Sequence, residues 1–250
     1  MVEEYVTGLT LPIAYHKALN ALRKFGEISD CSDWNCKQRE LSMTMIVNHP
    51  LGEPMISRCF IGGAKELQQY VMEMLDGILD FEVEQGNWTY TYHQRMGDQI
   101  QFVIDELKRN PSSRRAVMCI RTPEDMGSDD PACLQHLQYF IRNGSLDCTV
   151  LFRSNDACKA TFMNAFALIM LQKRIADALG IPVGRYVHRA NSFHCYEKDF
   201  SLLDGYVYRI KNNAVTMVTY NYVDDWDELM EDEIPDILAQ VEELKSHGKG

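Results

Sequence analysis

The chain has 250 residues, of which 46% are hydrophobic, and a formal net charge of −11. This composition supports a substantial core, and the negative charge argues against a nucleic-acid polymer as partner, because phosphate backbones bind concentrated basic surfaces. The N-terminus lacks the pattern of a signal peptide, and no apolar run approaches the roughly 18–20 residues of a membrane span. We therefore expect a soluble, cytoplasmic protein with no membrane partner.

Eight cysteines are scattered along the chain without the pattern of a disulfide framework. In a reducing cytosol such residues are free thiols, and most of them serve as small core residues. The stretch CSDWNC has no second ligand pair, so the sequence disfavours a zinc or thiol-redox protein and predicts no metal. The eight are Cys31, Cys36, Cys59, Cys119, Cys133, Cys148, Cys158 and Cys195.

The N-terminal quarter of the chain shows few regular patterns. We expect irregular structure there, with one helix near 13–24 and strands near 42–47 and 56–61. Apolar residues then recur at helical spacing, which predicts a helix over 65–81.

The middle of the chain alternates between helix and strand signals. An aromatic stretch between glycines predicts a loop over 86–97. An amphipathic helix is predicted within 98–115, with Asp98 as its N-cap and an end before Pro111. The apolar run at 115–121 predicts a strand.

The strongest local signals follow. Two alternating runs within 134–154 meet at Asn143–Gly144, which predicts a β-hairpin. The segment 159–180 is apolar on most faces, so it predicts a buried helix that ends at Gly180.

The last part of the chain predicts a strand followed by a loop over 184–200, a strand at 214–219 and one solvated helix in the acidic tail. We find no repeat, low-complexity tract or linker. The economical interpretation is one α/β domain over residues 1–250.

Basic residues occur at two places where a phosphate group could bind. Arg114 and Arg115 lie where a helix ends and a strand begins, and a solvated turn explains them about equally well. Arg153 and Ser154 end the second hairpin strand, and a guanidinium beside a hydroxyl suits a phosphate monoester.

The hairpin register brings Cys133 close to these groups. Pairing across Asn143–Gly144 places Cys133 opposite Ser154. A neighbouring Arg153 guanidinium favours the thiolate, which is the nucleophilic form of cysteine. With this pairing, Cys133 is a candidate nucleophile as well as a candidate core residue.

Three further polar residues are candidates for ligand binding. Asn164 lies in a helix that otherwise excludes polar groups, and a buried amide needs a hydrogen-bond partner. Such an amide can both donate and accept, so it could pair with an imide edge. His194 and Tyr196 lie two residues apart and could bind a sugar hydroxyl, although such a pair is more often part of a core.

The order of these motifs resembles the thymidylate synthase family. The likeness is carried by SRR, PACLQHLQ, FRSNDA followed by MN, and HCY, over about 100 of the 250 residues. The stretches YTYHQRMG, RSNDA and YEKD are most similar to archaeal-type synthases.

The resemblance implies a reaction in which dUMP is reductively methylated to dTMP. It implies a large twisted mixed β-sheet packed by helices, and a homodimer with its sheets back to back. The one-carbon donor would be methylene-tetrahydrofolate or a tetrahydromethanopterin-like reduced pterin.

The resemblance also implies a role for each site residue. Cys133 would add to C6 of the uracil, Tyr92 would assist proton removal from C5, and Asp156 would lie where nucleotide and donor meet. Arg153 and Ser154 would hold the phosphate with Arg114 and Arg115 of the other subunit, Asn164 would bind the uracil imide, and His194 and Tyr196 would bind the ribose.

This sequence departs from the family pattern at several positions. Leu134 replaces the histidine that usually follows the nucleophile, and Ser192 replaces the aspartate before the HxY motif. The family's catalytic glutamate has two candidates, Glu66 and Glu73. The nucleotide site is therefore better matched than the donor site.

Two other functions fit the same residues. A pyrimidine nucleotide hydroxymethylase would transfer the one-carbon unit to dUMP, dCMP or CMP without a hydride, although Asn164 argues against a cytosine base. A nucleotide-binding protein that has lost turnover is the second alternative. Release of the C5 proton of dUMP and the mass of the product distinguish the three.

Overall fold

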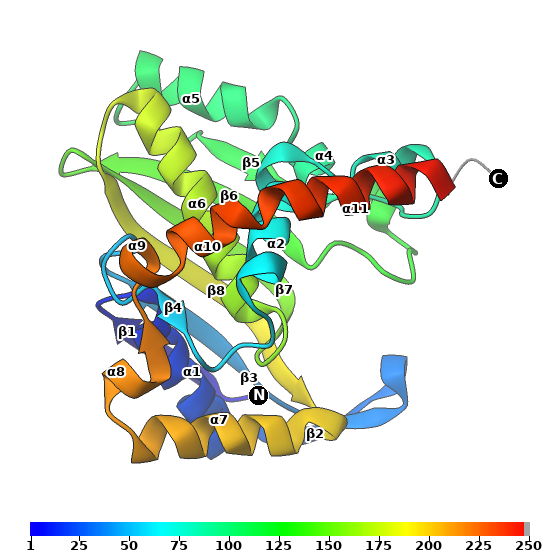
Figure 1. Cartoon of the computed structure of the whole chain (residues 1–250), viewed down its shortest axis with the longest axis vertical. Helices are drawn as coiled ribbons and strands as arrows, with labels where there is room; N and C mark the ends of the chain where they lie inside the picture. The colour runs from blue at the N-terminus through cyan, green and yellow to red at the C-terminus, as the bar shows by residue number, and fades with distance from the viewer. Residues whose placement is uncertain (248–250) are drawn as a thin grey trace.

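A seven-stranded mixed sheet forms the centre of the structure, a computed structural model that describes residues 1–247 (Figure 1). The strand order is β1-β3-β8-β7-β6-β5, and β2 pairs with β3. The β1–β3 and β7–β8 pairs are parallel, and the others are antiparallel, so the expected mixed α/β architecture is confirmed. The strands are β1 (Glu3–Gly8), β2 (Glu27–Cys31), β3 (Cys36–Val47), β5 (Val117–Cys119), β6 (Leu134–Arg142), β7 (Ser145–Asp156) and β8 (Val183–Tyr196).

Helices cover the sheet and extend beyond it (Figure 1). The longer helices are α1 (Leu11–Phe25), α2 (Ala64–Asp76), α5 (Gln99–Arg109), α6 (Thr161–Leu179), α7 (Phe200–Asn212) and α11 (Ile234–His247). The short ones are α3 (Phe81–Glu84), α4 (Tyr92–Met96), α8 (Val215–Val218), α9 (Tyr222–Asp225) and α10 (Asp227–Asp232). A small second sheet pairs β4 (Ile56–Ser57) with β9 (Thr219–Tyr220). Within residues 1–247, no helix combines the length and apolarity needed to cross a membrane.

Helix α6 runs through the core as its composition predicts. Side chains on most of its faces are buried, among them Phe162, Phe166 and Leu171. The helix ends at Gly180, whose φ of 69° is the left-handed conformation that glycine adopts most easily. This rigid element carries Asn164.

The β6–β7 hairpin also forms as predicted. Asn143 and Gly144 have φ angles of 52° and 78°, as a two-residue turn with both residues at positive φ requires. The register runs regularly from Arg142↔Ser145 to His136↔Leu151 and then shifts to Leu134↔Phe152.

This shift changes the residue opposite Cys133. Gln135 is the extra residue of a β-bulge, so the backbone N–H of Arg153, and not that of Ser154, donates to the Cys133 carbonyl at 2.8 Å. The predicted pairing of Cys133 with Ser154 is therefore wrong by one residue, because simple register arithmetic ignores bulges.

Several predicted elements have different bounds. The N-terminal quarter is regular, with two sheet strands and α1 before the long β3 strand. The prediction of irregular structure there is wrong, because these strands alternate polar and apolar residues only weakly. The predicted helix over 65–81 ends at Asp76, where Gly77 turns with a φ of 65°. The aromatic stretch 86–97 includes the short helix α4, and Asp98 occupies the N-cap position of α5 without a side-chain capping hydrogen bond.

The C-terminal third also differs from prediction. Strand β8 extends to Tyr196, and helix α7 follows it. The predicted strand at 214–219 is wrong, because α8 occupies most of it. The acidic tail forms three helices, and α11 buries Ile237 and Val241 as it runs across α2, so it is not simply solvated (Figure 1).

Candidate active site

A cavity of about 350 Å³ brings most of the predicted site residues together. It lies where β6 begins and where β7 and β8 end, beside α2, α4 and α6, so elements distant in sequence supply its walls. The predicted residues that line it are Tyr92, Cys133, Ser154, Asp156, Asn164, His194 and Tyr196. We name it the nucleotide cavity, because it contains every predicted contact to base and sugar.

Cys133 lies directly before β6, and its neighbours hold it in place. The Leu134 N–H donates to the Tyr92 hydroxyl at 3.3 Å. The Arg153 guanidinium donates to the carbonyls of Pro131 and Ala132 at 2.6 and 3.2 Å. Arg153 therefore fixes the turn that presents the thiol to the cavity.

The electrostatics of Cys133 differ from the sequence-based expectation. Burial raises the pKa of Cys133 above its ordinary value, Arg153 lowers it and Asp130 raises it again. Arg153 thus acts on the pKa in the predicted direction, but burial outweighs it and the net pKa of Cys133 is raised.

A second bulge directs His194 and Tyr196 into the cavity. The β3–β8 register passes from Met43↔Ala190 to Leu41↔Phe193, so β8 has one residue more than β3 at this point. Phe193 is then buried on the core face, and His194 points to the opposite face. The bulge thus allows β8 to place Phe193 in the core and both His194 and Tyr196 in the cavity.

His194 is a neutral hydrogen-bonding group in this setting. Its Nδ1 lies 3.4 Å from the hydroxyls of both Ser154 and Ser192, and its ring meets Tyr196 edge-on at 4.8 Å between centroids. Burial lowers the pKa of His194, and Asp156 opposes that effect. At neutral pH the imidazole therefore pairs with hydroxyls without carrying a charge.

Asn164 has hydrogen-bond partners that the sequence did not indicate. Asn155 donates from Nδ2 to Asn164 Oδ1 at 2.8 Å, and Asn164 Nδ2 donates to the Tyr70 hydroxyl. Asn155 Oδ1 in turn accepts from Thr161 Oγ1 at 2.7 Å and from His188 Nε2 at 2.9 Å. These bonds fix which end of the Asn164 amide is nitrogen and which is oxygen.

The buried imidazole at the end of this chain is neutral. Burial lowers the pKa of His188 to about 3, and Tyr186 donates to its Nδ1 at 2.9 Å. The neutral tautomer therefore carries its proton on Nε2, as donation to Asn155 requires.

Sequence reasoning missed three polar residues that line the cavity. Tyr70 belongs to the apolar stripe of α2, Asn155 lies between two predicted site residues, and Lys159 lies in the turn before α6. Lys159 pairs with Asp199 at 2.7 Å, which raises the pKa of the lysine. Of these three residues, only Asn155 could have been found from the sequence, because it is a polar residue at the end of a predicted strand.

Arg114 and Arg115 are exposed and line neither cavity of the protomer. They lie on the segment between α5 and β5, where the Ser113 hydroxyl accepts from the Arg115 N–H at 3.1 Å. Within a single protomer the structure does not bring them to the predicted site.

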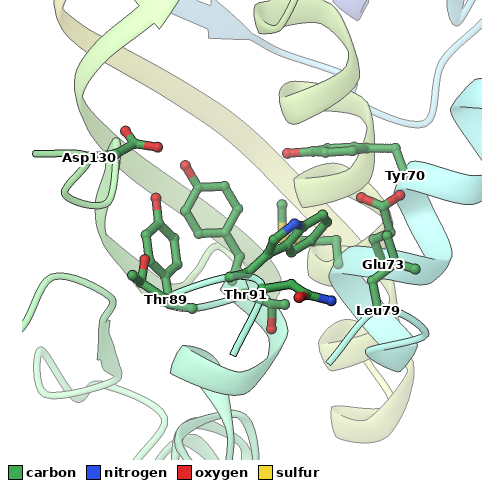
Figure 2. A pocket seen from close by; sticks show the side chains of 11 residues that line it. Tyr70, Glu73, Leu79, Thr89, Thr91 and Asp130 are labelled. Carbon is green, nitrogen blue, oxygen red and sulfur yellow. The ribbon is translucent and has the colours of Figure 1, made fainter. Parts of the chain in front are cut away.

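A second cavity of about 510 Å³ adjoins the first, and Tyr70 and Tyr92 line both. We name it the aromatic cavity. Figure 2 shows Glu73 and Asp130 on opposite sides of it. Its other lining residues include Leu79, Asn87, Trp88, Thr89, Tyr90 and Thr91.

The aromatic cavity distinguishes the two candidate glutamates. Glu66 accepts a hydrogen bond from the Gly63 N–H at 2.7 Å and so caps the N-terminus of α2. Glu73 lines the cavity two turns later, and burial raises the pKa of its carboxyl while a hydrogen bond from Gln69 opposes this. Glu73 is therefore the glutamate placed for chemistry.

Residues 1–247 contain no group of three or more histidine, cysteine, aspartate or glutamate side chains placed to hold a metal ion. The chemistry of both cavities rests on one thiol, neutral phenols and imidazole, amides and carboxylates. Such groups suit nucleophilic addition with proton transfer.

Comparisons with known proteins identify the family of the chain. A family model of thymidylate synthase matches residues 67–247. A "Putative thymidylate synthase" of Methanocaldococcus jannaschii is 31% identical over 204 residues, which cover 77% of this chain and 91% of the relative. The thymidylate synthase of Bacillus licheniformis is 31% identical over 120 residues, which cover 48% of this chain and 43% of the relative.

A solved structure shares the fold. Thermostable thymidylate synthase A from Bacillus subtilis superposes with a TM-score of 0.64 at 18% identity, covering 80% of this chain and 84% of that one. The matched range includes every residue that lines the two cavities, whereas β1 to β4 precede it. The chain belongs to the thymidylate synthase family.

Proposed function

We propose that this protein is a thymidylate synthase that converts dUMP to dTMP through a covalent bond between Cys133 and C6 of the uracil. The observation that carries this proposal is the nucleotide cavity, where a thiol lies together with an amide and with the imidazole and phenol of the HxY motif. Family membership supports a one-carbon transfer, and the cavity supports the nucleotide as its acceptor.

Cys133 supplies the nucleophile in this proposal. Its raised pKa means that a base must accept the thiol proton, or that bound substrate must lower the pKa, before attack. The dianionic phosphate would draw Arg153 from the Pro131 carbonyl to itself, because a guanidinium binds phosphate more strongly than a neutral carbonyl. Ser154 would donate a further hydrogen bond to the phosphate.

Asn164 selects the base. Its oxygen keeps one lone pair and its nitrogen one N–H that the partners within the protein do not use. Uracil presents an N3–H beside the O4 carbonyl, so both free positions of the amide find partners. His194 and Tyr196 bind the ribose hydroxyl.

Addition at C6 makes C5 nucleophilic, and the new one-carbon bond forms there. Tyr92 would assist the later removal of the C5 proton as a neutral phenol, because burial raises its pKa. Its hydroxyl already accepts from the Leu134 N–H, so the O–H proton is free to orient a water molecule. Glu73, whose carboxyl has a raised pKa, accepts or returns protons from the adjoining cavity.

The aromatic cavity fits a reduced pterin-type donor, either methylene-tetrahydrofolate or a tetrahydromethanopterin-like compound. Trp88 and Tyr90 offer flat apolar surfaces for a heterocycle, and Glu73 and Asp130 offer acceptors for its amino and ring N–H groups. When bound, the donor supplies a methylene carbon and then a hydride. Asp156 lies on the nucleotide side of this junction.

We further propose a homodimer in which Arg114 and Arg115 reach the partner's phosphate. Both side chains are exposed, and neither lines the nucleotide cavity of its own chain. Along β7, Leu146, Cys148 and Val150 are buried while the alternate side chains are partly exposed, which leaves a sheet face available for pairing. Mixing inactive Cys133→Ser with inactive Arg115→Ala should regain activity if the arginine acts across subunits.

The direct test is to incubate the protein with dUMP and methylene-tetrahydrofolate, or with a methanopterin donor, and to weigh the nucleotide product. We expect a gain of one CH₂ unit in dTMP and release of tritium from C5-labelled dUMP. A hydroxymethyl product would instead assign the protein as a hydroxymethylase. Binding of dUMP without tritium release from either donor would contradict both enzymatic functions.

A further inference from the structure

Two cysteines outside the active site face each other across a hairpin. Strands β2 and β3 pair antiparallel, and the last pair of their register is Cys31↔Cys36. Directly opposed residues in such a ladder have Cα atoms about 4.5–5.5 Å apart, within the range that a disulfide spans. The two thiols therefore lie in a bridgeable arrangement without backbone rearrangement.

Both thiols are accessible. Cys31 and Cys36 are partly exposed, and the residues of the connecting turn are exposed, with Trp34 at 70%. By contrast, the sulfurs of Cys158 and Cys195 lie 3.8 Å apart but are sealed in the core. Of these two pairs, a solvent oxidant can reach only the hairpin pair.

The thiol pair lies on the same sheet face as the ribose-binding residues. The β3–β8 register pairs Gln38 with Tyr196, and the β2–β3 register runs without irregularity from Gln38 to Cys36. Since residues two apart in a strand share a face, Cys36 continues the row that contains Tyr196. Cys31 contributes to raising the pKa of Tyr196, after burial, which agrees with their closeness.

The turn between the cysteines contacts the active site directly. Trp34 meets Tyr196 edge-on, with ring centroids 6.5 Å apart, and Tyr196 lines the nucleotide cavity. The turn is a 3-10 helix (Ser32–Trp34) followed by Asn35 in the left-handed conformation. A bond between the flanking cysteines would close this turn into a small ring and hold Trp34 against Tyr196.

We propose that Cys31 and Cys36 form a reversible disulfide that acts as a redox-modification site coupled to the nucleotide cavity through Trp34 and Tyr196. The oxidant is a low-molecular-weight disulfide. One cysteine thiolate attacks a sulfur of glutathione disulfide and releases one glutathione, and the other displaces the second glutathione. Two protein thiols lose two electrons and two protons, and one disulfide is reduced to two thiols.

The effect on ligand binding rests on the proposed function. The disulfide removes conformational freedom from the turn before the nucleotide arrives, so less ordering remains to oppose binding. We expect the oxidised protein to bind dUMP about two- to tenfold more tightly than the reduced protein, since ordering one side chain has a cost of that size.

The test begins with equilibration of the full chain in glutathione buffers of varied ratio, followed by peptide mass mapping. We expect a linked Cys31–Cys36 peptide 2 Da lighter than the two free thiols, with Cys133 at its free-thiol mass. The Cys36→Ser variant must lose the linkage, and Cys119→Ser, at an exposed single cysteine, must keep it. Failure to form the linkage at any ratio overturns the proposal.

Calorimetric titration with dUMP then tests the coupling. The oxidised-to-reduced affinity ratio should fall to one in Cys36→Ser and in Trp34→Ala, although Trp34→Ala still forms the disulfide. An unchanged affinity in oxidised wild type overturns the coupling. If the reduced protein does not bind dUMP, the proposed function fails, and the mass loss alone decides whether the redox site exists.

Discussion

The two adjoining cavities differ in what their walls offer. The nucleotide cavity is small, and a thiol, two linked amides and a lysine line it. The aromatic cavity is larger, and rings and two carboxylates line it, with no basic side chain. The contrast fits the proposed division of work, in which one cavity would bind the nucleotide covalently and the other would hold a flat carrier, with Tyr70 and Tyr92 as the shared wall.

The largest expected effect concerns Cys133, the proposed nucleophile of the nucleotide cavity. Cys133→Ser should lower kcat on the order of 10⁴-fold, because a hydroxyl is a much weaker nucleophile than a thiolate. Tritium release from C5-labelled dUMP measures the loss, and Cys119→Ser serves as the matched control. A Cys133→Ser protein that still exchanges the C5 proton at the wild-type rate would remove Cys133 from the mechanism.

The next effect separates the two glutamates of α2. Glu73→Gln should lower kcat by about 10²-fold, as expected when a proton-transferring carboxyl is lost. Glu66→Gln should leave kcat unchanged, because an amide oxygen can still cap the helix. Steady-state kinetics on both variants make the comparison, and equal losses would contradict the assignment of Glu73.

The amide pair provides a smaller and more specific effect. Asn155→Ala leaves the Asn164 oxygen without its donor and should weaken dUMP binding about tenfold. In Asn155→Asp the carboxylate accepts instead of donating, so the Asn164 amide should turn over. Calorimetry should then show the ratio of dCMP to dUMP affinity rising, and an unchanged ratio would exclude this role for Asn155.

Loss of an aromatic ring from the aromatic cavity should weaken binding of the donor and leave binding of the nucleotide unchanged. Trp88→Ala should raise KM for the donor about fivefold, which corresponds to the loss of one stacking contact. The Kd for dUMP should stay at its wild-type value. If the KM for the donor and the Kd for dUMP rose by the same factor, the two cavities would not divide the substrates as proposed.

The smallest expected effect is a shift in a titration midpoint. Because burial raises the pKa of Cys133, iodoacetamide should alkylate it with a midpoint above the ordinary thiol value of about 8.5. Arg153→Leu should move the midpoint higher still, since Arg153 lowers this pKa. Rates followed by peptide mass against pH give both midpoints, and a downward shift in Arg153→Leu would contradict the electrostatic assignment.

The sequence allowed prediction of much of the central sheet and of the nucleotide cavity. The Asn143–Gly144 turn and the apolar length of α6 are local signals, so the hairpin and the helix that carries Asn164 could be predicted. The site residues on β7 and β8 followed from motifs that lie within single strands.

Other features could not be predicted, for physical reasons. Tyr70 and Glu73 occupy the same face of α2 as core residues, so helical spacing alone cannot separate cavity from core. The bulge at Gln135 has no mark in the sequence, and it moved the partner of Cys133 by one residue. The net pKa of Cys133 depends on burial, which only the folded structure sets.

The extra residue in β8 has a consequence for engineering and for natural variation. Phe193 and His194 alternate between core and cavity only because three residues of β8 stand against two of β3. Deleting Asn191 would even out the pairing with β3 and keep Phe193 opposite Leu41, but it would shift β8 by one residue against β7, where Ser154 now lies opposite Ser192. Single-residue gaps at this place should therefore be far less tolerated than many substitutions.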